Sequence, residues 1–200
     1  MSYECIKVTK QNHVTSVLLN RPDAMNAITP EMHHELQDAF DVFSKDENEF
    51  VAVIRGAGDR AFCAGSDLKT IAAGGFKAYP KSGYAGLIER FDLNKPLIAA
   101  VDGFALGGGF EVALACDIIV ATHRSSFGLP EPLVGAVALG GGIHRLARQI
   151  GLKQAMGMVL TADRVSADEG FRMGFVNQVV DTDALDKTVD EVCEKILRCA

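Results

Sequence analysis

The sequence predicts an α/β fold built around parallel strands, and two observations support this prediction. First, residues 51–54, 97–101 and 118–121 form short, continuously apolar segments, a pattern typical of buried parallel strands. Second, stretches with helical periodicity separate these segments, and a hairpin pattern precedes the first of them. Strands that alternate with helices favour right-handed crossover connections and a mostly parallel sheet.

The first predicted elements are a hairpin and a helix. Residues 3–10 alternate loosely between apolar and polar, residues 14–19 are β-branched and apolar, and an Asn-His pair between them signals a turn. A helix begins after Thr29, where a hydroxyl N-cap is followed by a proline and an acid. Its apolar residues recur at helical spacing as far as Phe43.

Similar patterns predict the later elements. Ser166, followed by an acid at Glu169, forms a capping box and indicates a short helix. Residues 175–180 indicate a strand, and an apolar stripe between Leu185 and Ile196 predicts a final helix, which stops at the last residue without a glycine or proline cap. Helices are also predicted over residues 68–73, 84–93, 142–150 and 153–160.

The composition is that of an ordinary globular protein. The 200 residues suit one domain, and contents of 48% apolar and 23% charged residues exclude disordered, collagen-like and coiled-coil proteins. The net charge of −6 disfavours nucleic-acid-binding and membrane-surface proteins, which are usually basic. We therefore expect no nucleic acid and no membrane among the partners, and an anionic ligand would need local donors.

The cysteines and the N-terminus indicate in which cellular compartment the protein is expected. The five cysteines are odd in number, scattered and without a CxxC pair, so they suggest neither a disulfide framework nor a zinc ribbon. The first residues lack the apolar core of a secretory signal, and no 18 uncharged apolar residues run together. The simplest expectation is a reduced, cytoplasmic compartment.

Common nucleotide-binding and metal-binding motifs are absent from the sequence. It contains no P-loop, no GxGxxG after a strand, no GxSxG elbow and no HExxH. None of the five histidines pairs with another at metal-ligand spacing. We therefore expect no metal site.

Two loops that follow predicted strands consist largely of small residues. Residues 61–68 follow the strand at 51–54, and the triple glycine 107–109 lies between the strand at 97–101 and a helix. Small residues leave backbone N–H groups uncovered at a helix N-terminus, and loops at the carboxyl ends of parallel strands meet at the ligand crevice. The loops could aim two N–H groups at one oxygen, as an oxyanion hole does, although tight packing is the alternative explanation.

Two acids are candidates for proton transfer. Glu111 lies just inside the helix after the triple glycine, and Glu131 lies between two prolines that stiffen the backbone. A helix and a returning strand can bring both carboxyls to one crevice, where they can hold opposite protonation states. Alternatively, Glu111 complements the helix dipole and Glu131 is an ordinary loop acid.

Seven segments carry a resemblance to a known family. They are Asn20-Arg21-Pro22 with Ala24 and Asn26-Ala27, Ala61 to Leu68, Lys95 to Gly103, Ala105 to Glu111, Cys116-Asp117, Phe127 to Glu131 and Gly140 to Gly142. In order and spacing they resemble the enoyl-CoA hydratase/isomerase (crotonase) superfamily. The resemblance implies a single acyl-CoA-binding domain over residues 1–200, folded as a spiral of ββα units.

The resemblance also implies roles for individual residues. By position, the amides of Ala64 and Gly108 would hold the thioester oxygen and stabilise an enolate. Glu131 would transfer the proton at the α-carbon, and Glu111 would handle the water. The positions that hold the CoA moiety are those of Ala24, Ala64, Ser66, Asp67, Leu68 and Gly108. Coenzyme A would enter as part of the substrate, with no separate cofactor.

Isomerases of the family tend to keep only the later acid, so the resemblance implies a hydro-lyase that adds or removes water across the Cα–Cβ bond of a 2-enoyl-CoA or 3-hydroxyacyl-CoA. Residues 83–87, 91–96 and 109–111 resemble the crotonobetainyl-CoA hydratase (carnitinyl-CoA dehydratase) branch, and a generic short-chain enoyl-CoA hydratase is the alternative. Two further interpretations remain open. The first is an enoyl-CoA isomerase, which would need Glu131 alone. The second is a non-catalytic relative that binds acyl-CoA or RNA.

The chain departs from the family pattern in two places. Many members carry a proline after Gly135, where this chain has residues 136–139 before the glycines. In the family this loop can shape the acyl pocket. Family members also run longer, with C-terminal helices that cover the site and help to form trimers. We expect this C-terminal part to be truncated here, and a homotrimer or hexamer to form if those helices are present.

Overall fold

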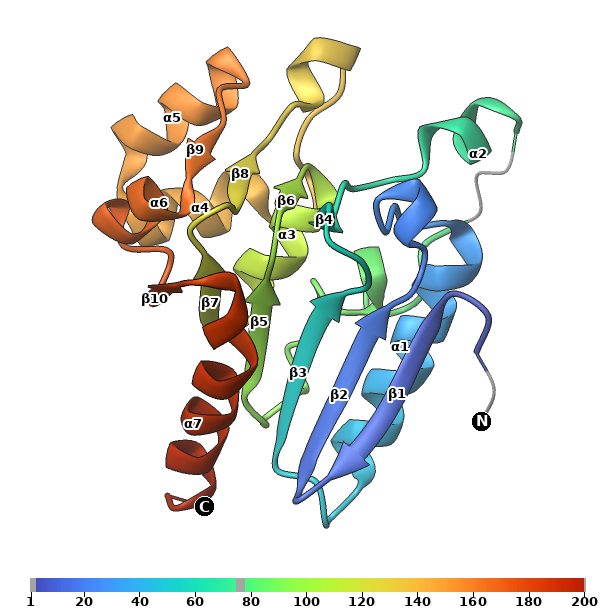
Figure 1. Ribbon diagram of the computed structural model, residues 1–200. Coiled ribbons are helices and arrows are strands. Elements are labelled where there is room, and N and C mark those ends of the chain that lie inside the picture. The colour runs from blue at the N-terminus through green and yellow to red at the C-terminus, as the bar shows by residue number, and fades with distance from the viewer. Residues whose placement is uncertain (1–2, 75–77, 200) are drawn as a thin grey trace.

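The larger of two β-sheets forms the base of the molecule in this computed structural model, which describes residues 3–74 and 78–199 (Figure 1). Its strands are β1 (Ile6–Gln11), β2 (Val14–Leu19), β3 (Val51–Gly56), β5 (Leu97–Val101), β7 (Ile118–Thr122) and β10 (Gln178–Val180), hydrogen-bonded in that order. β1 and β2 form the predicted antiparallel hairpin, with Ile6 opposite Leu19. The other four neighbouring pairs are parallel, which confirms the predicted α/β class.

A smaller sheet lies beyond the carboxyl ends of these strands. It consists of β4 (Ala61–Cys63), β6 (Phe104–Leu106), β8 (Ser126–Gly128) and β9 (Val165–Ser166), in that order. The first three are parallel neighbours, and β9 is antiparallel to β8. Because β4, β6 and β8 directly follow β3, β5 and β7 along the chain, the structure has the expected spiral of ββα units. Strands of two or three residues show no readable alternation, so local pattern did not predict them.

Helix α1 (Pro30–Lys45) covers one face of the larger sheet and lies behind it in Figure 1. Its apolar side, from Met32 to Phe43, is buried. The Thr29 side chain accepts a hydrogen bond from the Met32 amide at 3.2 Å, so the predicted N-cap is confirmed.

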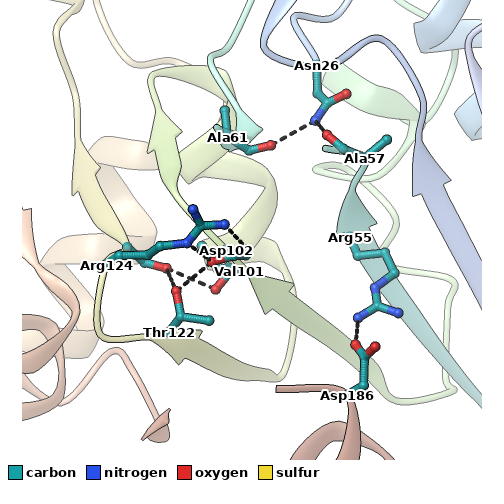
Figure 2. Close-up of polar contacts among 10 residues, drawn as sticks. Asn26, Arg55, Ala57, Ala61, Val101, Asp102, Thr122, Arg124 and Asp186 are labelled. Carbon is teal, nitrogen blue, oxygen red and sulfur yellow. Dashed lines mark hydrogen bonds and ion pairs between the residues drawn. The ribbon is translucent and has the colours of Figure 1, made fainter. Parts of the chain in front are cut away.

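Helix α7 (Leu185–Leu197) covers the opposite face and lies in front of the sheet in Figure 1. Val189 packs in a second apolar cluster with Val53 of β3. An ion pair between Arg55 and Asp186 also links β3 to this helix, as Figure 2 shows. The predicted final helix is thus confirmed as a layer of the fold.

The remaining helices connect the strands. They are α2 (Leu68–Ala72), α3 (Gly108–Ala115), α4 (Gly142–Ile150), α5 (Leu152–Thr161) and α6 (Ala167–Met173), with short 3₁₀ turns η1 (Pro22–Ala24), η2 (Tyr84–Gly86), η3 (Glu131–Val134) and η4 (Thr182–Ala184). The Ser166 hydroxyl accepts from the Glu169 amide at 3.2 Å, which confirms the N-cap predicted for α6.

Two predicted elements are wrong in extent. The helix expected over 84–93 is only the short η2, because Gly83, Ala85 and Gly86 adopt φ values of +75°, +55° and +59°, which a helix does not allow. The strand expected over 175–180 is confined to β10, because the residues before it turn into the core.

None of the helices within residues 3–74 and 78–199 is long and apolar enough to cross a membrane. The expectations that concern Met1, Ser2 and Ala200 lie outside the described residues.

Candidate active site

The candidate site lies where three adjacent strands of the smaller sheet end. β4, β6 and β8 are parallel neighbours, so the segments that follow them emerge at the same edge. Ser66 follows β4, Gly108 and Glu111 follow β6, and Glu131 follows β8. The smaller sheet therefore gathers residues that are far apart in the sequence.

The two small-residue loops touch each other through their backbones. Gly65 has a φ of +90°, and a Cβ placed on it would lie 2.9 Å from the Leu106 oxygen and 3.1 Å from the Gly108 nitrogen. A Cβ on Gly109 would lie 2.1 Å from the Cys63 oxygen. The tight packing weighed as the alternative explanation is therefore present, and it is what brings the two loops together.

The hydrogen bonds of the first loop correct one prediction. The Ala64 amide donates to the Met25 oxygen at 3.0 Å, so this N–H is not available to a substrate. The Ser66 amide, two residues later, has no hydrogen-bond partner within residues 3–74 and 78–199. The same holds for the Gly108 amide, which lies in the first turn of α3. The structure therefore offers Ser66 and Gly108, rather than Ala64 and Gly108, as the pair of free donors.

One phenol hydroxyl shows that Ser66 and Gly108 lie close to each other. The Ser66 hydroxyl donates to Tyr84 Oη at 3.1 Å, and a Cβ on Gly108 would lie 2.3 Å from the same Oη. Sequence reasoning used Tyr84 only as part of a branch resemblance and gave it no place in the site. No local pattern could have placed it there, because the contact is between distant segments.

Glu111 is the most deeply buried acid of the site, with 4% of its surface exposed. Its Oε1 accepts a hydrogen bond from the Gly142 amide at 2.9 Å. The pKa of Glu111 is raised to about 7, chiefly by burial and also by the nearby charge of Glu131, while the Gly142 and Gly140 amides and the Arg145 charge oppose the shift. Glu111 therefore exists in both protonation states near neutral pH.

The glycine run 140–142 lies against the Glu111 carboxyl group. A Cβ on Gly140 would lie 2.4 Å from Oε2 of Glu111, and one on Gly142 would lie 3.1 Å from Oε1. Side chains at these positions would displace the acid. The sequence pattern assigns these glycines no role in the site. The run of three glycines is the sequence signal that could have indicated a close approach of the backbone to another group.

Glu131 lies at the start of η3 and is partly buried. Burial raises the pKa of its carboxyl group, and its Oε2 is buried without a hydrogen-bond partner among the described residues. A Cβ on Gly107 would lie 3.2 Å from its Oε1, so the acid lies beside the turn that carries the Gly108 amide. A buried polar atom without a partner is costly, and it marks a place where a proton or a ligand belongs.

The positions expected to hold CoA also lie together. Ala24 ends η1, and the turn that follows η1 is bridged to Ser66 through Ile28. Asp67 caps α2 and pairs with Arg21 at 2.9 Å, so Arg21 holds this loop in place. Leu68, by contrast, is 58% exposed beside the free amides.

Asn26 links the turn after η1 by hydrogen bonds to the segment that leads into the loop of residues 61–68. Its side chain is buried, and its Nδ2 donates to the carbonyl oxygens of Ala57 and Ala61 at 2.9 and 2.8 Å, as Figure 2 shows. The backbone of Asn26 has a φ of +54°. The loop of Ser66 thus rests on a turn that is itself fixed by side-chain hydrogen bonds.

The arrangement combines two backbone donors with two acids of raised pKa. Donors that converge on one oxygen stabilise the negative charge that develops on it, and an acid with a pKa near neutrality, such as Glu111, can both give and take protons. Within the described part of the chain, no group of three or more His, Cys, Asp or Glu side chains is placed to hold a metal ion.

Comparisons with known proteins all point to one family. A family model described as enoyl-CoA hydratase/isomerase matches residues 9–200. The chain is 41% identical over 199 residues to a carnitinyl-CoA dehydratase of Proteus mirabilis, covering 98% of this chain and 76% of that protein. A carnitinyl-CoA dehydratase of Salmonella typhi is 40% identical over 199 residues, with the same coverage.

Solved structures agree with this match. EchA1_1 of Mycobacterium paratuberculosis superposes with a TM-score of 0.94 at 38% identity, over 98% of this chain and 76% of that one. A carnitinyl-CoA dehydratase of Mycobacterium avium 104 also gives a TM-score of 0.94, at 37% identity, over 98% of this chain and 77% of that one.

Proposed function

The chain belongs to the enoyl-CoA hydratase/isomerase family, and from this premise we propose that it is a hydro-lyase acting on the Cα–Cβ bond of a CoA thioester. It would convert a 2-enoyl-CoA and water into a 3-hydroxyacyl-CoA, or the reverse. The observation that carries this proposal is the placement of Glu111 and Glu131 beside the free amides of Ser66 and Gly108.

The two amides would bind the thioester oxygen. When water adds to the β-carbon, negative charge moves through the Cα–Cβ bond onto this oxygen and forms an enolate. Each N–H aimed at such an oxygen typically contributes about 10²–10³ in rate. Ser66 takes the place first assigned to Ala64, because the Ala64 amide is already bonded to Met25.

The two acids would carry the protons. In hydration, the Glu111 carboxylate takes a proton from water as the water oxygen bonds to the β-carbon. The carboxylic acid form of Glu131 then gives its proton to the α-carbon, and the enolate electrons form the new C–H bond. Dehydration reverses both transfers. The raised pKa of both groups supports this division of labour, since each must hold a proton for part of the cycle.

We propose that the CoA moiety lies over Ala24 and the segment from Ser66 to Leu68. These residues adjoin the proposed oxyanion hole, and the exposed Leu68 offers an apolar contact. Binding through backbone groups fits an acidic chain, which has no net positive field to attract phosphates. Coenzyme A is then part of the substrate, and no separate cofactor takes part.

For the acyl group we propose the carnitinyl and crotonobetainyl thioesters. Support comes from the carnitinyl-CoA dehydratases of Proteus mirabilis and Salmonella typhi, which share 41% and 40% identity with this chain. The solved carnitinyl-CoA dehydratase of Mycobacterium avium adds structural support.

We also propose that residues 1–200 form one acyl-CoA-binding domain in the cytoplasm, and that this domain assembles as a homotrimer or hexamer where the C-terminal helices of the family are present. Exposed apolar side chains around η3, α4 and α5 support assembly, among them Leu133, Val134, Leu139, Leu152 and Leu160. The five cysteines are all free, which suits a reducing compartment.

The test is a panel of enoyl-CoA thioesters that includes crotonyl-CoA and crotonobetainyl-CoA. Hydration removes the conjugated double bond, so loss of the conjugated thioester absorbance reports the reaction. We expect water addition, with crotonobetainyl-CoA the preferred substrate. If 3-enoyl-CoA is isomerised and no thioester on the panel gains water, the hydro-lyase proposal is wrong.

A further inference from the structure

The phenol of Tyr84 is buried at the junction of the two loops that carry the free amides. Only 5% of its surface is exposed. Its Oη lies 3.1 Å from the Ser66 hydroxyl and fills the space where a side chain of residue 108 would start, 2.3 Å from an ideal Cβ. The same hydroxyl therefore meets both residues whose amides are free.

Tyr84 is itself held from outside the two loops. Its ring packs edge-on against His33 of α1, with ring centroids 4.6 Å apart, and Nδ1 of His33 accepts a hydrogen bond from the Ala85 amide at 2.8 Å. A Cβ on Gly86 would lie 2.4 Å from the Gln37 Cα, so this segment lies directly on the backbone of α1. Helix α1 thus provides a rigid support for the phenol.

We propose that Tyr84 is a positioning residue that fixes the Ser66 and Gly108 amides in the geometry that binds the thioester oxygen. This inference rests on the proposed function, because it assigns Tyr84 to the oxyanion hole of that reaction. An oxyanion hole accelerates a reaction only if its donors are oriented before charge develops. The triple glycine 107–109 has no side chains and the loop of residues 61–68 has mostly small ones, so they have little of their own to prevent them from shifting. Tyr84 restrains one loop by a hydrogen bond and the other by direct contact.

The surroundings keep this contact neutral. Burial raises the pKa of Tyr84 well above its ordinary value, and burial lowers the pKa of His33 to about 4. Both side chains are therefore uncharged near neutral pH, and the phenol keeps its proton. The hydroxyl accepts from Ser66 without bringing a charge next to the enolate oxygen.

Two substitutions remove the hydrogen bond from opposite ends. Tyr84→Phe keeps the ring against Gly108 and removes the hydroxyl, whereas Ser66→Ala keeps the amide and removes Oγ. We expect each to lower kcat for crotonyl-CoA about 10-fold, less than the loss of a whole donor, with KM within about 3-fold of the parent. The double variant should match the single ones, because both changes break one interaction.

A spectroscopic measurement separates positioning from a merely structural role. Hydrogen bonds to the carbonyl of a conjugated thioester polarise it and shift its absorbance to longer wavelength. Cinnamoyl-CoA bound to the parent should show this red shift, and cinnamoyl-CoA bound to Tyr84→Phe or Ser66→Ala should show a smaller one at saturation. Tyr3→Phe removes a hydroxyl that bonds Asp38 at the surface and serves as the matched control, with parent values of kcat and band position.

The outcomes distinguish this inference from the proposed function. If the parent hydrates crotonyl-CoA and both variants retain the parent kcat and band position, the positioning role is wrong. It is also wrong if the effects of the two substitutions add. If the parent hydrates no thioester, the proposed function fails, and the band positions of bound cinnamoyl-CoA still decide whether Tyr84 orients the donors. If Tyr84→Phe does not fold, Ser66→Ala alone decides by the same two measurements.

Discussion

The backbone N–H of Gly142 donates to Oε1 of Glu111 at 2.9 Å, and this bond ties the first residue of α4 to a buried acid in the first turn of α3. Glu111 therefore does not simply complement the dipole of its own helix. Burial favours its neutral form and the amide favours its charged form, so the protonation state of Glu111 depends on the position of a glycine turn in a different element.

Removal of either acid should abolish hydration without unfolding the protein. We expect Glu111→Gln and Glu131→Gln each to lower kcat/KM for crotonyl-CoA by about 10²–10⁴-fold, the typical contribution of a positioned general acid or base. Circular dichroism of both variants should match that of the parent. Parent-like hydration by both variants would show that these acids do not carry the reaction.

Gly140→Ala should reduce activity by moving Glu111. The new Cβ would lie 2.4 Å from Oε2 of Glu111, and because this atom ends a flexible side chain, the carboxyl group should shift while the fold survives. We expect kcat to fall about 10–100-fold, as a misplacement of about 1 Å typically causes.

The matched control for Gly140→Ala is Gly157→Ala in α5, where a Cβ would meet no atom within 4 Å. We expect this change to leave kcat unchanged and to raise stability by up to about 1 kcal/mol, because alanine favours a helix over glycine. Steady-state kinetics and urea unfolding of the two variants test both expectations. Equal kcat values for them would mean that the glycine turn does not hold the acid.

The raised pKa of Glu111 makes stability depend on pH. Because its pKa is about 7 in the folded state and 4.5 in the reference state, the folded protein binds the proton more tightly. The resulting stabilisation is fully present below about pH 4.5 and is lost as pH rises through about 7. Over this range the free energy of unfolding falls by about 3 kcal/mol. Glu111→Gln should remove this loss, so the variant should be more stable than the parent at pH 8.

Urea unfolding from pH 4.5 to 8 measures this effect. The exposed Glu191→Gln on α7 is the control and should follow the parent across the range. A difference between Glu111→Gln and the parent that stays constant with pH would rule out a titrating acid at this position.

Asn26 should be important for stability as well as for the loop of Ser66. Asn26→Ala leaves the Ala57 and Ala61 carbonyls without their donor and places alanine at a φ of +54°. We expect a loss of about 2–4 kcal/mol in the free energy of unfolding. Asn12→Ala shares the backbone conformation, with a φ of +51°, but its side chain is exposed, so it should lose only about 1 kcal/mol. Equal losses would show that the hydrogen bonds of Asn26 contribute nothing.

Several elements could be predicted because their signals are local. The Thr29 cap, the helical spacing up to Phe43 and the apolar run of β3 act over a few residues, so the sequence reveals them directly. The error over residues 84–93 has the opposite cause. Packing of Gly86 against Gln37 imposes a backbone that the local pattern does not favour.

The identity of the free amide could not be predicted. Ala64 and Ser66 lie in the same run of small residues, and both look uncovered in the sequence. Only the fold brings the Met25 carbonyl against the Ala64 amide and leaves the Ser66 amide free. The motif therefore indicated free amides in this loop but placed one of them at Ala64, whose N–H is already bonded to Met25.

The sequence by itself determined the α/β class, the glycine-rich turns and the two acids, because helix caps, apolar periodicity and glycine runs express themselves within a short stretch of chain. The tertiary structure alone decided which amides stay free, which acid is held by Gly142 and that Tyr84 contacts both Ser66 and Gly108. These are contacts between distant segments, and a hydrogen bond formed with one partner removes that group from every other, so they follow from the packed structure as a whole.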